Sequence, residues 1–317
     1  MNSNSGNVER SAFIAVVGRP NVGKSSLLNR IIGQKIAIVS NKPQTTRTRI
    51  MGVLTKGEDQ LVYIDTPGFH KPKNKLGESM MRSVSDGMSG VDAVTLVVEA
   101  APKFGFDPDN LPAAEVALIE EFKKRNLHAV LAVNKTDLLA DRTELLSVIS
   151  AYSRLYDFDA VVPVSAQSGD GVDELVAEQL KFSKPAPHFF DDGDTTDQAD
   201  SVMVCEMIRE KILLLLVKEI PHGTAVALER FFERDTAAGD PIIEVDAVIY
   251  CERESHKGII IGKGGAMLKK VGSLARADIE EFFGCKCNLK LWVKVKEDWR
   301  NRAQILQNFG FDEKNFD

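Results

Sequence analysis

The chain has 317 residues, enough for about two domains that each bury a hydrophobic core. Hydrophobic residues (44%) and charged residues (27%) occur in the proportions of an ordinary soluble globular protein. The net charge of −6 argues against a protein that coats nucleic acid through its overall charge, so any RNA binding must come from a local basic patch.

Cysteine content and the first residues bear on the compartment. Four cysteines are too few for a disulfide scaffold, and the pair Cys285 and Cys287 lacks the second pair that a zinc site needs, so we expect free thiols. Residues 1–6 lack the basic and apolar regions of a signal peptide. The longest aliphatic run, 212–217, is far shorter than the roughly 20 residues that span a bilayer. We therefore expect a cytoplasmic protein.

Short apolar runs alternate with helical stretches from residue 13 to about residue 182. Continuous runs rich in β-branched residues are typical of strands that are covered on both faces. The alternation therefore predicts an α/β domain over 13–182 with a mostly parallel sheet, preceded by an N-terminal tail over 1–12. The expected strands lie at 13–17, 61–64, 93–98, 129–133 and 160–164.

A second pattern follows a segment with the composition of a linker. Residues 183–201 are rich in Pro, Gly, Asp and Thr. Over 202–298 we expect the order α-β-β-α-α-β, and over 299–317 a C-terminal tail. The expected elements are a helix at 202–220 ended by Pro221, strands at 224–231 and 242–250, a short helix, a helix from about 266 to 283, and a strand at 288–295.

A glycine-rich loop after the first expected strand matches the phosphate-binding pattern G-x-x-x-x-G-K-[ST]. Backbone N–H groups of such a loop surround phosphates at the positive end of the following helix. Lys24 would reach the β- and γ-phosphates, and the Ser25 hydroxyl would ligate Mg²⁺. The candidate phosphate-binding residues are Gly18, Arg19, Pro20, Asn21, Val22, Gly23, Lys24, Ser25 and Ser26.

The motif Asp65-Thr66-Pro67-Gly68 follows the expected strand at 61–64. A carboxylate there can hold Mg²⁺ through a water, and the Gly68 N–H can meet the γ-phosphate, although a Pro-Gly pair alone is an ordinary turn. The polar segment 43–49 supplies a threonine that can coordinate Mg²⁺ when GTP is bound. The sequence leaves the choice between Thr45 and Thr46 open.

The motif Asn134-Lys135-Thr136-Asp137 indicates selection of guanine. The Asp137 carboxylate can accept hydrogen bonds from guanine N1–H and the 2-amino group, a pair of donors that adenine lacks. Asn134 would brace the base loops, the Lys135 stem would lie along the purine, and Ser165-Ala166 would place a backbone N–H near guanine O6. In this order the motifs predict a GTPase that binds GTP or GDP with Mg²⁺.

Phe69 occupies the position where Ras-type GTPases carry the glutamine that orients the attacking water. A phenyl ring cannot hydrogen-bond a water. We therefore expect slow intrinsic hydrolysis, with the water positioned by backbone, ions or a partner. The sequence therefore offers no candidate catalytic residue, and Lys24 and Gly68 are the expected γ-phosphate contacts.

A second glycine loop lies between two expected helices of the C-terminal unit. A Gly-x-x-Gly turn in this setting is how KH domains clamp single-stranded RNA, and the aliphatic residues 259–261 would line a groove for bases. The candidate RNA-binding residues are Arg253, Lys257, Gly258, Ile261, Gly262, Lys263, Gly264, Gly265, Lys269 and Lys270.

The order of these motifs strongly resembles the Era family of bacterial ribosome-assembly GTPases, from about residue 13 to residue 299. The most specific stretches are 18–25, 43–47, 208–211 and 255–265. The resemblance implies a P-loop GTPase domain followed by a type II KH domain that binds the 3′ end of 16S ribosomal RNA. It further implies a role in 16S rRNA processing and 30S ribosomal subunit biogenesis, with peripheral association at the cytoplasmic face of the cell membrane.

We expect a monomer, and two alternative functions stay open. A GTP-dependent tRNA-modification factor would need a further catalytic site, for which the sequence offers no candidate. A membrane-associated signalling switch would use the apolar run 213–216 for lipid contact, although its helical spacing favours a place in the core.

Overall fold

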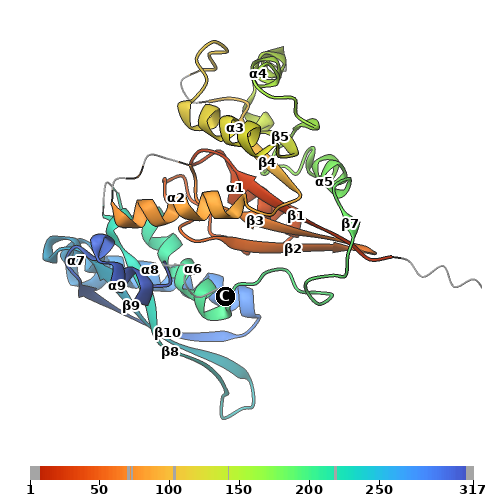
Figure 1. Ribbon diagram of the computed structural model, residues 1–317. Coiled ribbons are helices and arrows are strands. Elements are labelled where there is room, and N and C mark those ends of the chain that lie inside the picture. Colours follow the sequence, from red (N-terminus) through yellow and green to blue (C-terminus); the bar gives the residue numbers. More distant parts are fainter. Residues whose placement is uncertain are drawn as a thin grey trace, which may run out of the picture. The chain divides into compact units, whose positions relative to one another are not determined.

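The computed structural model describes residues 8–69, 72, 74–102, 105–141, 143–217 and 220–311 (Figure 1). The chain divides into two compact units. The first comprises Met1–Ala37, Thr46–Lys71 and Met80–Asp197, and the second comprises Ile38–Thr45, Pro72–Ser79 and Gln198–Asp317. None of the helices in the described ranges has the length and apolar character that crossing a bilayer requires.

The first unit is built on a sheet with the strand order β2-β3-β1-β4-β5-β6, which confirms the predicted α/β class. All neighbouring strands on this path are parallel except β2 and β3. The strands are β1 (Arg10–Val17), β2 (Ile50–Lys56), β3 (Asp59–Asp65), β4 (Ala93–Glu99), β5 (Ala129–Asn134) and β6 (Ala160–Pro163), and β7 (Lys184–Pro185) pairs with β1. The helices are α1 (Lys24–Ile32), α3 (Ala113–Arg125), α4 (Thr143–Ser153) and α5 (Val172–Leu180), while α2 (Lys75–Gly87) has residues in both units.

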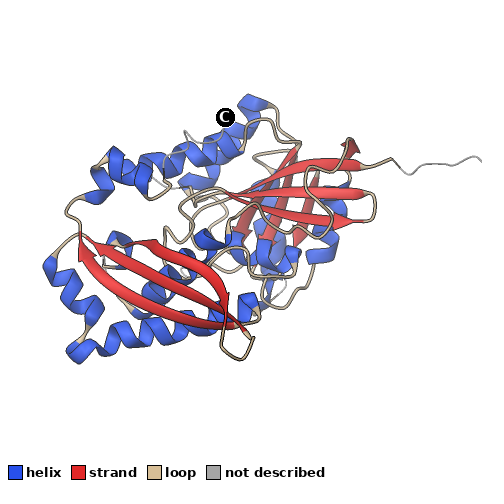
Figure 2. Ribbon diagram, turned by 90° about the horizontal axis from the view of Figure 1, so that it is seen from below, coloured by secondary structure: helices blue, strands red, loops and turns tan. Residues whose placement is uncertain are grey.

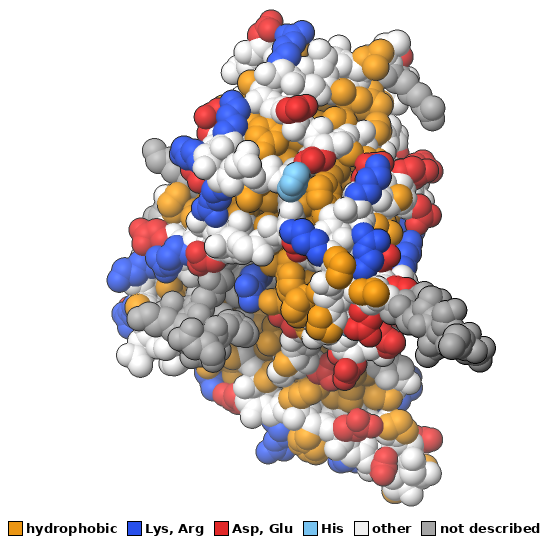
Figure 3. Space-filling view, turned by 45° about the vertical axis from the view of Figure 1, so that its right-hand side comes forward, with side chains coloured by type: hydrophobic (Ala, Val, Ile, Leu, Met, Phe, Trp, Pro, Cys, Tyr) orange, Lys and Arg blue, Asp and Glu red, His pale blue; other side chains and the backbone are white. Residues whose placement is uncertain are grey.

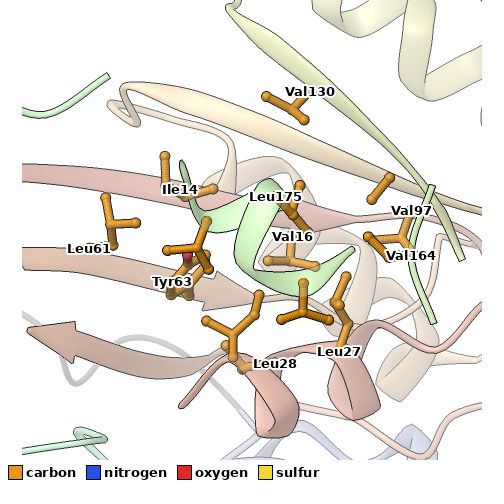
Figure 4. Close-up of a cluster of buried hydrophobic side chains, with 14 of the residues drawn as sticks. Ile14, Val16, Leu27, Leu28, Leu61, Tyr63, Val97, Val130, Val164 and Leu175 are labelled. Atoms are coloured by element: carbon orange, nitrogen blue, oxygen red, sulfur yellow. The ribbon is translucent and has the colours of Figure 1, made fainter. Parts of the chain in front are cut away.

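Alternate residues of β1 enter two separate cores, which explains why the strand is continuously apolar. Ile14 and Val16 pack with Leu27 and Leu28 of α1, as Figure 4 shows. Ala15 and Val17 belong to the cluster on the other face of the sheet, which we call the α3-side core because it contains Leu118, Ile119 and Phe122. Burial on both faces is the property that the apolar runs predicted.

The segment expected to be a linker is attached to the first unit over much of its length. Its strand β7 pairs with β1, and the Gln60 side chain accepts the Phe189 and Phe190 N–H groups at 2.8 and 3.1 Å. Farther along, the Val53 N–H donates to the Thr195 carbonyl at 2.9 Å. Residues 184–197 are therefore bound to the sheet of the first unit and do not form a free linker.

The second unit has the element order α-β-β-α-α-β that the sequence predicts. Its sheet order is β10-β9-β8, with β8 antiparallel and β10 parallel to β9, and α6 and α8 pack on this sheet (Figure 2). The elements are α6 (Asp200–Leu215), η2 (Pro221–Gly223), β8 (Ala225–Asp235), β9 (Pro241–Cys251), α7 (Glu254–Ile261), η3 (Lys263–Gly265), α8 (Ala266–Phe283) and β10 (Lys286–Val295).

Two boundaries in this unit differ from expectation. The first helix ends at Leu215, before Pro221, which instead begins a short 3₁₀ turn. Residues after 298, expected to be a tail, form η4 (Trp299–Asn301) and α9 (Ala303–Asn308). The Trp299 side chain is fully buried and its Nε1–H donates to the Gly223 carbonyl at 2.9 Å, which anchors this segment to the unit.

Candidate functional site

The candidate phosphate-binding loop, residues 18–25, joins β1 to α1 and depends on two glycines. A Cβ atom on Gly18 would lie 2.4 Å from the Val97 carbonyl oxygen, and one on Gly23 would lie 2.3 Å from the Asn134 side-chain nitrogen. Gly23 also has φ +98°, a conformation that other residues rarely adopt. The loop therefore closes tightly on the neighbouring strands and on the predicted guanine motif.

Lys24 lies at the first position of α1, with its ammonium group inside the loop. It donates to the carbonyl oxygens of Gly18 and Arg19, both at 3.2 Å. Burial lowers the pKa of Lys24 to about 8, although Asp65 partly opposes this effect. Among the described residues, the partners of this buried cation are two carbonyl groups and one nearby carboxylate, so it is well suited to bind a phosphate.

Three oxygen-bearing side chains meet beside Lys24. The Ser25 hydroxyl donates to Asp65 Oδ2 at 2.7 Å and lies 2.9 Å from Thr46 Oγ1. Asp65 Oδ1 is buried without a hydrogen-bond partner among the described residues, and burial raises the pKa of this carboxyl group. Hydroxyl and carboxylate oxygens are the ligands that Mg²⁺ prefers, so this cluster fits the metal that the sequence predicts.

The structure separates the two candidate threonines. The Thr45 hydroxyl donates to the Lys42 carbonyl at 2.6 Å and lies 2.7 Å from Ser40 Oγ, within the second unit. Thr46 instead belongs to the first unit, beside Ser25. This arrangement favours Thr46 as the metal ligand.

The segment after Asp65 folds back on the phosphate loop. A Cβ on Gly68 would lie 2.7 Å from the Pro20 Cα, and the Phe69 N–H donates to the Gly18 carbonyl at 3.1 Å. The Thr66 hydroxyl donates to the Val16 carbonyl at 3.0 Å, and Pro67 is buried. The Phe69 ring packs against the α3-side core.

The predicted guanine loops are braced by Asn134, as expected. Its Nδ2 donates to the Val22 carbonyl at 2.8 Å, and its Oδ1 accepts the Ala166 N–H at 3.0 Å. If the Ala166 N–H also contacts guanine O6, its hydrogen must be shared between that oxygen and Asn134 Oδ1. Ser165 Oγ donates to Asp137 Oδ1 at 2.6 Å, and the Asp137 side chain is exposed, so it is open to a base.

The remaining residues of this motif fix the loop. The Thr136 hydroxyl donates to the Val164 carbonyl at 3.0 Å, and the Lys135 ammonium donates to the Asn21 carbonyl at 2.7 Å. Lys135 also binds Glu99, which we did not anticipate from the sequence. The only signal for Glu99 is that it follows the apolar run 93–98 as a single charged residue.

The second glycine loop joins α7 to α8. Gly262, Gly264 and Gly265 have φ values of +74°, +59° and +81°, and a Cβ on Gly264 or Gly265 would have no described atom within 4 Å. The loop is therefore open on its outer side. The basic side chains near it are exposed or partly exposed: Arg253, Lys257, Lys263, Lys269 and Lys270.

The aliphatic residues beside this loop do not all face outward. Ile260 is completely buried in the core of the unit, whereas Ile259 is 49% exposed and Ile261 is partly exposed. The expected groove can therefore use Ile259 and Ile261 but not Ile260, because neighbouring helix positions point to different sides. Gly258 has no described atom within 4 Å of a Cβ built on it, which leaves room beside α7.

Comparison with known proteins identifies both units. Residues 13–135 match the family model described as a 50S ribosome-binding GTPase, and residues 219–300 match a KH domain. The chain is 49% identical to GTPase Era of Ruminiclostridium cellulolyticum, covering 95% of this chain and 97% of the relative. It is 46% identical to GTPase Era of Clostridioides difficile, covering 96% and 99%.

Two solved structures also resemble the whole chain. A crystal structure of Era in complex with MgGDPNP and nucleotides 1506–1542 of 16S ribosomal RNA has a TM-score of 0.88 and 31% identity, covering 96% of this chain and 99% of that one. A variant of Aquifex aeolicus Era bound to GDP and AlF₄⁻ has a TM-score of 0.88 and 32% identity with the same coverage.

Proposed function

Because this chain belongs to the Era family of GTPases, we propose that it is a GTP-hydrolysing switch that binds the 3′ end of 16S ribosomal RNA and acts in 16S rRNA processing and 30S subunit biogenesis. The observation that carries the switch is the meeting of Ser25, Thr46 and Asp65 beside Lys24. All three residues belong to the first unit, and Thr46 lies in the segment 43–49 in which the sequence predicts a metal-binding threonine.

The nucleotide would be held mainly by backbone and by Lys24. The tight loop at 18–23 directs N–H groups at the phosphates, and the ammonium of Lys24 exchanges its carbonyl partners for phosphate oxygens. Ser25 and Thr46 would hold Mg²⁺ directly and Asp65 through a water. The metal supplies neutralisation of the charge that develops on the phosphates. Asp137 would select guanine from the exposed side of its loop.

Intrinsic hydrolysis is expected to be slow. Phe69 offers no hydrogen bond to a water, and its partly buried ring packs against the α3-side core. The attacking water must then be oriented by backbone groups, the metal or a partner. Single-turnover hydrolysis with and without small ribosomal subunits measures this, and fast hydrolysis by the isolated protein would contradict it.

RNA would bind at the loop between α7 and α8. Phosphates would lie against the backbone of the glycine loop and the N-terminus of α8, while Ile259 and Ile261 contact bases. On the face drawn in Figure 3, acidic and basic side chains are interspersed, which agrees with a net charge of −6. Binding must therefore depend on this local site and not on overall charge.

Aspartates at Gly264 and Gly265 test the RNA site. Both positions have left-handed backbone, which Asp tolerates better than most residues, and the added side chains meet open space. We expect the double variant to lose binding to single-stranded RNA from the 16S 3′ end while its GDP affinity stays unchanged. Gly239→Asp is the matched control, because Gly239 has φ +88° and equally open surroundings in the β8–β9 hairpin. Retained RNA affinity in the double variant would overturn the assignment.

We also propose a cytoplasmic monomer that associates peripherally with the cell membrane, on the basis of its family. Of the apolar run considered for lipid contact, Leu213 and Leu216 are buried and Leu214 is 53% exposed, so the run mainly serves the core. This burial does not favour a signalling switch that inserts the run into lipid. Flotation with anionic vesicles measures the association, and sedimentation of the protein alone tests the monomer.

A further inference from the structure

An ion-pair network in the first unit links the candidate phosphate loop (residues 18–25) to the candidate guanine loop (residues 134–137). Arg19, in the phosphate loop, donates from Nε to Glu115 Oε1 at 2.8 Å and from Nη2 to Glu99 Oε2 at 2.5 Å. Both carboxylates are shielded from water, with side-chain exposures of 1% for Glu115 and 13% for Glu99. A partly buried guanidinium that donates one hydrogen bond to each of two shielded carboxylates is held far better than it would be in a surface ion pair.

Glu99 bridges the two loops with its two oxygens. While Oε2 accepts from Arg19, Oε1 accepts from the Lys135 ammonium. Lys135 also donates to the carbonyl of Asn21, inside the phosphate loop. The position of Glu99 is set by the sheet, because it ends β4 directly opposite Asn134 of β5.

Glu115 anchors the network to the helices behind it. It lies in the first turn of α3, and its Oε2 accepts from the Tyr152 hydroxyl of α4. Burial raises the pKa of this carboxyl group, and the hydrogen bond from Tyr152 and the charge of Arg19 oppose that change. A buried carboxylate is costly without such partners, so Glu115 holds Arg19 firmly.

We propose that Glu99 and Glu115 are positioning residues for the nucleotide, because they hold Arg19 and Lys135 so that the phosphate loop and the guanine loop keep one fixed spacing. Neither carboxylate needs to touch the nucleotide. The proposal rests on the proposed nucleotide site, since it matters only if the base lies along Lys135 and the phosphates lie in the loop of Arg19. Loss of the bridge should then speed nucleotide release.

Charge removal at Glu99 tests the proposal in the full chain. Glu99→Gln keeps the size of the side chain but removes the charge that attracts both cations, so we expect release of a fluorescent GDP analogue to become about tenfold faster in a stopped-flow experiment. Glu115→Gln should also speed release, and less strongly, because it reaches only Arg19. Glu121→Gln is the matched control: Glu121 lies on the same helix α3 and pairs with Lys124 at 2.7 Å on the surface.

A second readout separates positioning from a purely structural role. A structural role would lower the melting temperature equally with and without GDP and leave release unchanged, and that result overturns the proposal. With a positioning role, the rise in melting temperature on adding GDP shrinks, because this rise depends on affinity. Lys135→Met by itself should also speed GDP release. Glu99→Gln should then accelerate release less in the Lys135→Met variant than in the wild type, because one of the two cations that Glu99 holds is already gone. Full additivity of the two changes in release rate would count against the bridge.

Two further variants make the outcomes distinguishable. If Asp137→Ala leaves GDP affinity unchanged, the proposed nucleotide site itself fails. If Asp137→Ala weakens GDP binding and Glu99→Gln does not speed release, only the bridge fails. If Glu99→Gln does not fold, Glu99→Asp replaces it in the test. Aspartate keeps the charge on a shorter side chain that cannot reach both cations. Faster GDP release by this variant supports the proposal, and unchanged release refutes it.

Discussion

Replacing Gly262 by alanine tests how the glycine loop of the second unit is built. Gly262 has φ +74° and ψ 172°, a region occupied almost only by glycine, which costs other residues about 1–3 kcal/mol. A Cβ there would also lie 2.7 Å from the Met267 Cβ and 2.9 Å from the Met267 backbone nitrogen, so the start of α8 would have to move. We expect Gly262→Ala to lower the free energy of unfolding of the second unit by about 3 kcal/mol.

Gly264 provides the contrast within the same loop. Its φ of +59° and ψ of 24° are ordinary left-handed values, and its Cβ would meet open space. The strain of about 1–2 kcal/mol is partly offset by the lower entropy of the unfolded alanine variant, which leaves a loss of about 1 kcal/mol. The two variants should therefore differ by about 2 kcal/mol.

Tryptophan fluorescence in urea measures this difference selectively. The chain has two tryptophans, Trp292 and Trp299, and both lie in the second unit. A difference of about 2 kcal/mol should separate the urea midpoints of the two variants by roughly 1 M. Gly239→Ala, in an open hairpin at φ +88°, should behave like Gly264→Ala. Equal midpoints for Gly262→Ala and Gly264→Ala would refute the reasoning.

Three other predictions concern single side chains. Burial raises the pKa values of the Cys205 and Cys287 thiols to about 12, so in Ellman titrations at pH 8 both should react far more slowly in the native than in the unfolded protein; rapid reaction of all four cysteines would contradict this. Tyr63→Phe removes a buried hydrogen bond of 2.7 Å to Gln179 and should destabilise the first unit by about 1–3 kcal/mol, with an unchanged melting temperature as the contrary result. Phe69→Gln should not accelerate single-turnover GTP hydrolysis, because the side chain at this position is directed against the α3-side core; a large acceleration would show that it reaches the water.

The candidate nucleotide motifs could be found in the sequence because each of them lies in a few consecutive residues. The phosphate loop, the Asp65 motif and the guanine motif follow strands that are apolar on both faces, and this pattern marks the loops at the ends of parallel strands. The choice between the two candidate metal ligands needed the structure, which places Thr46 and not Thr45 beside Ser25.

Features that depend on pairing between distant segments were not predictable. The strand β2 is a different case: only Gly57 and Glu58 join it to its antiparallel partner β3, and it was missed because Gly52 interrupts its short apolar run. The bridge at Glu99 joins residues that are distant in sequence, such as Arg19 and Lys135. The segment after 298 looked like a tail because its anchor, Trp299, is a single residue whose burial only the folded unit determines.

The attachment of residues 184–197 has a consequence for producing the GTPase part alone. Gly52 forms an antiparallel bridge with Thr196, and Met51 accepts the Thr196 hydroxyl, so this segment covers the outer edge of β2. An uncovered edge strand offers unpaired backbone groups to other chains and promotes aggregation. A fragment that stops at residue 182 would expose this edge. A fragment that continues to Asp197 should stay in solution at concentrations where the shorter one precipitates.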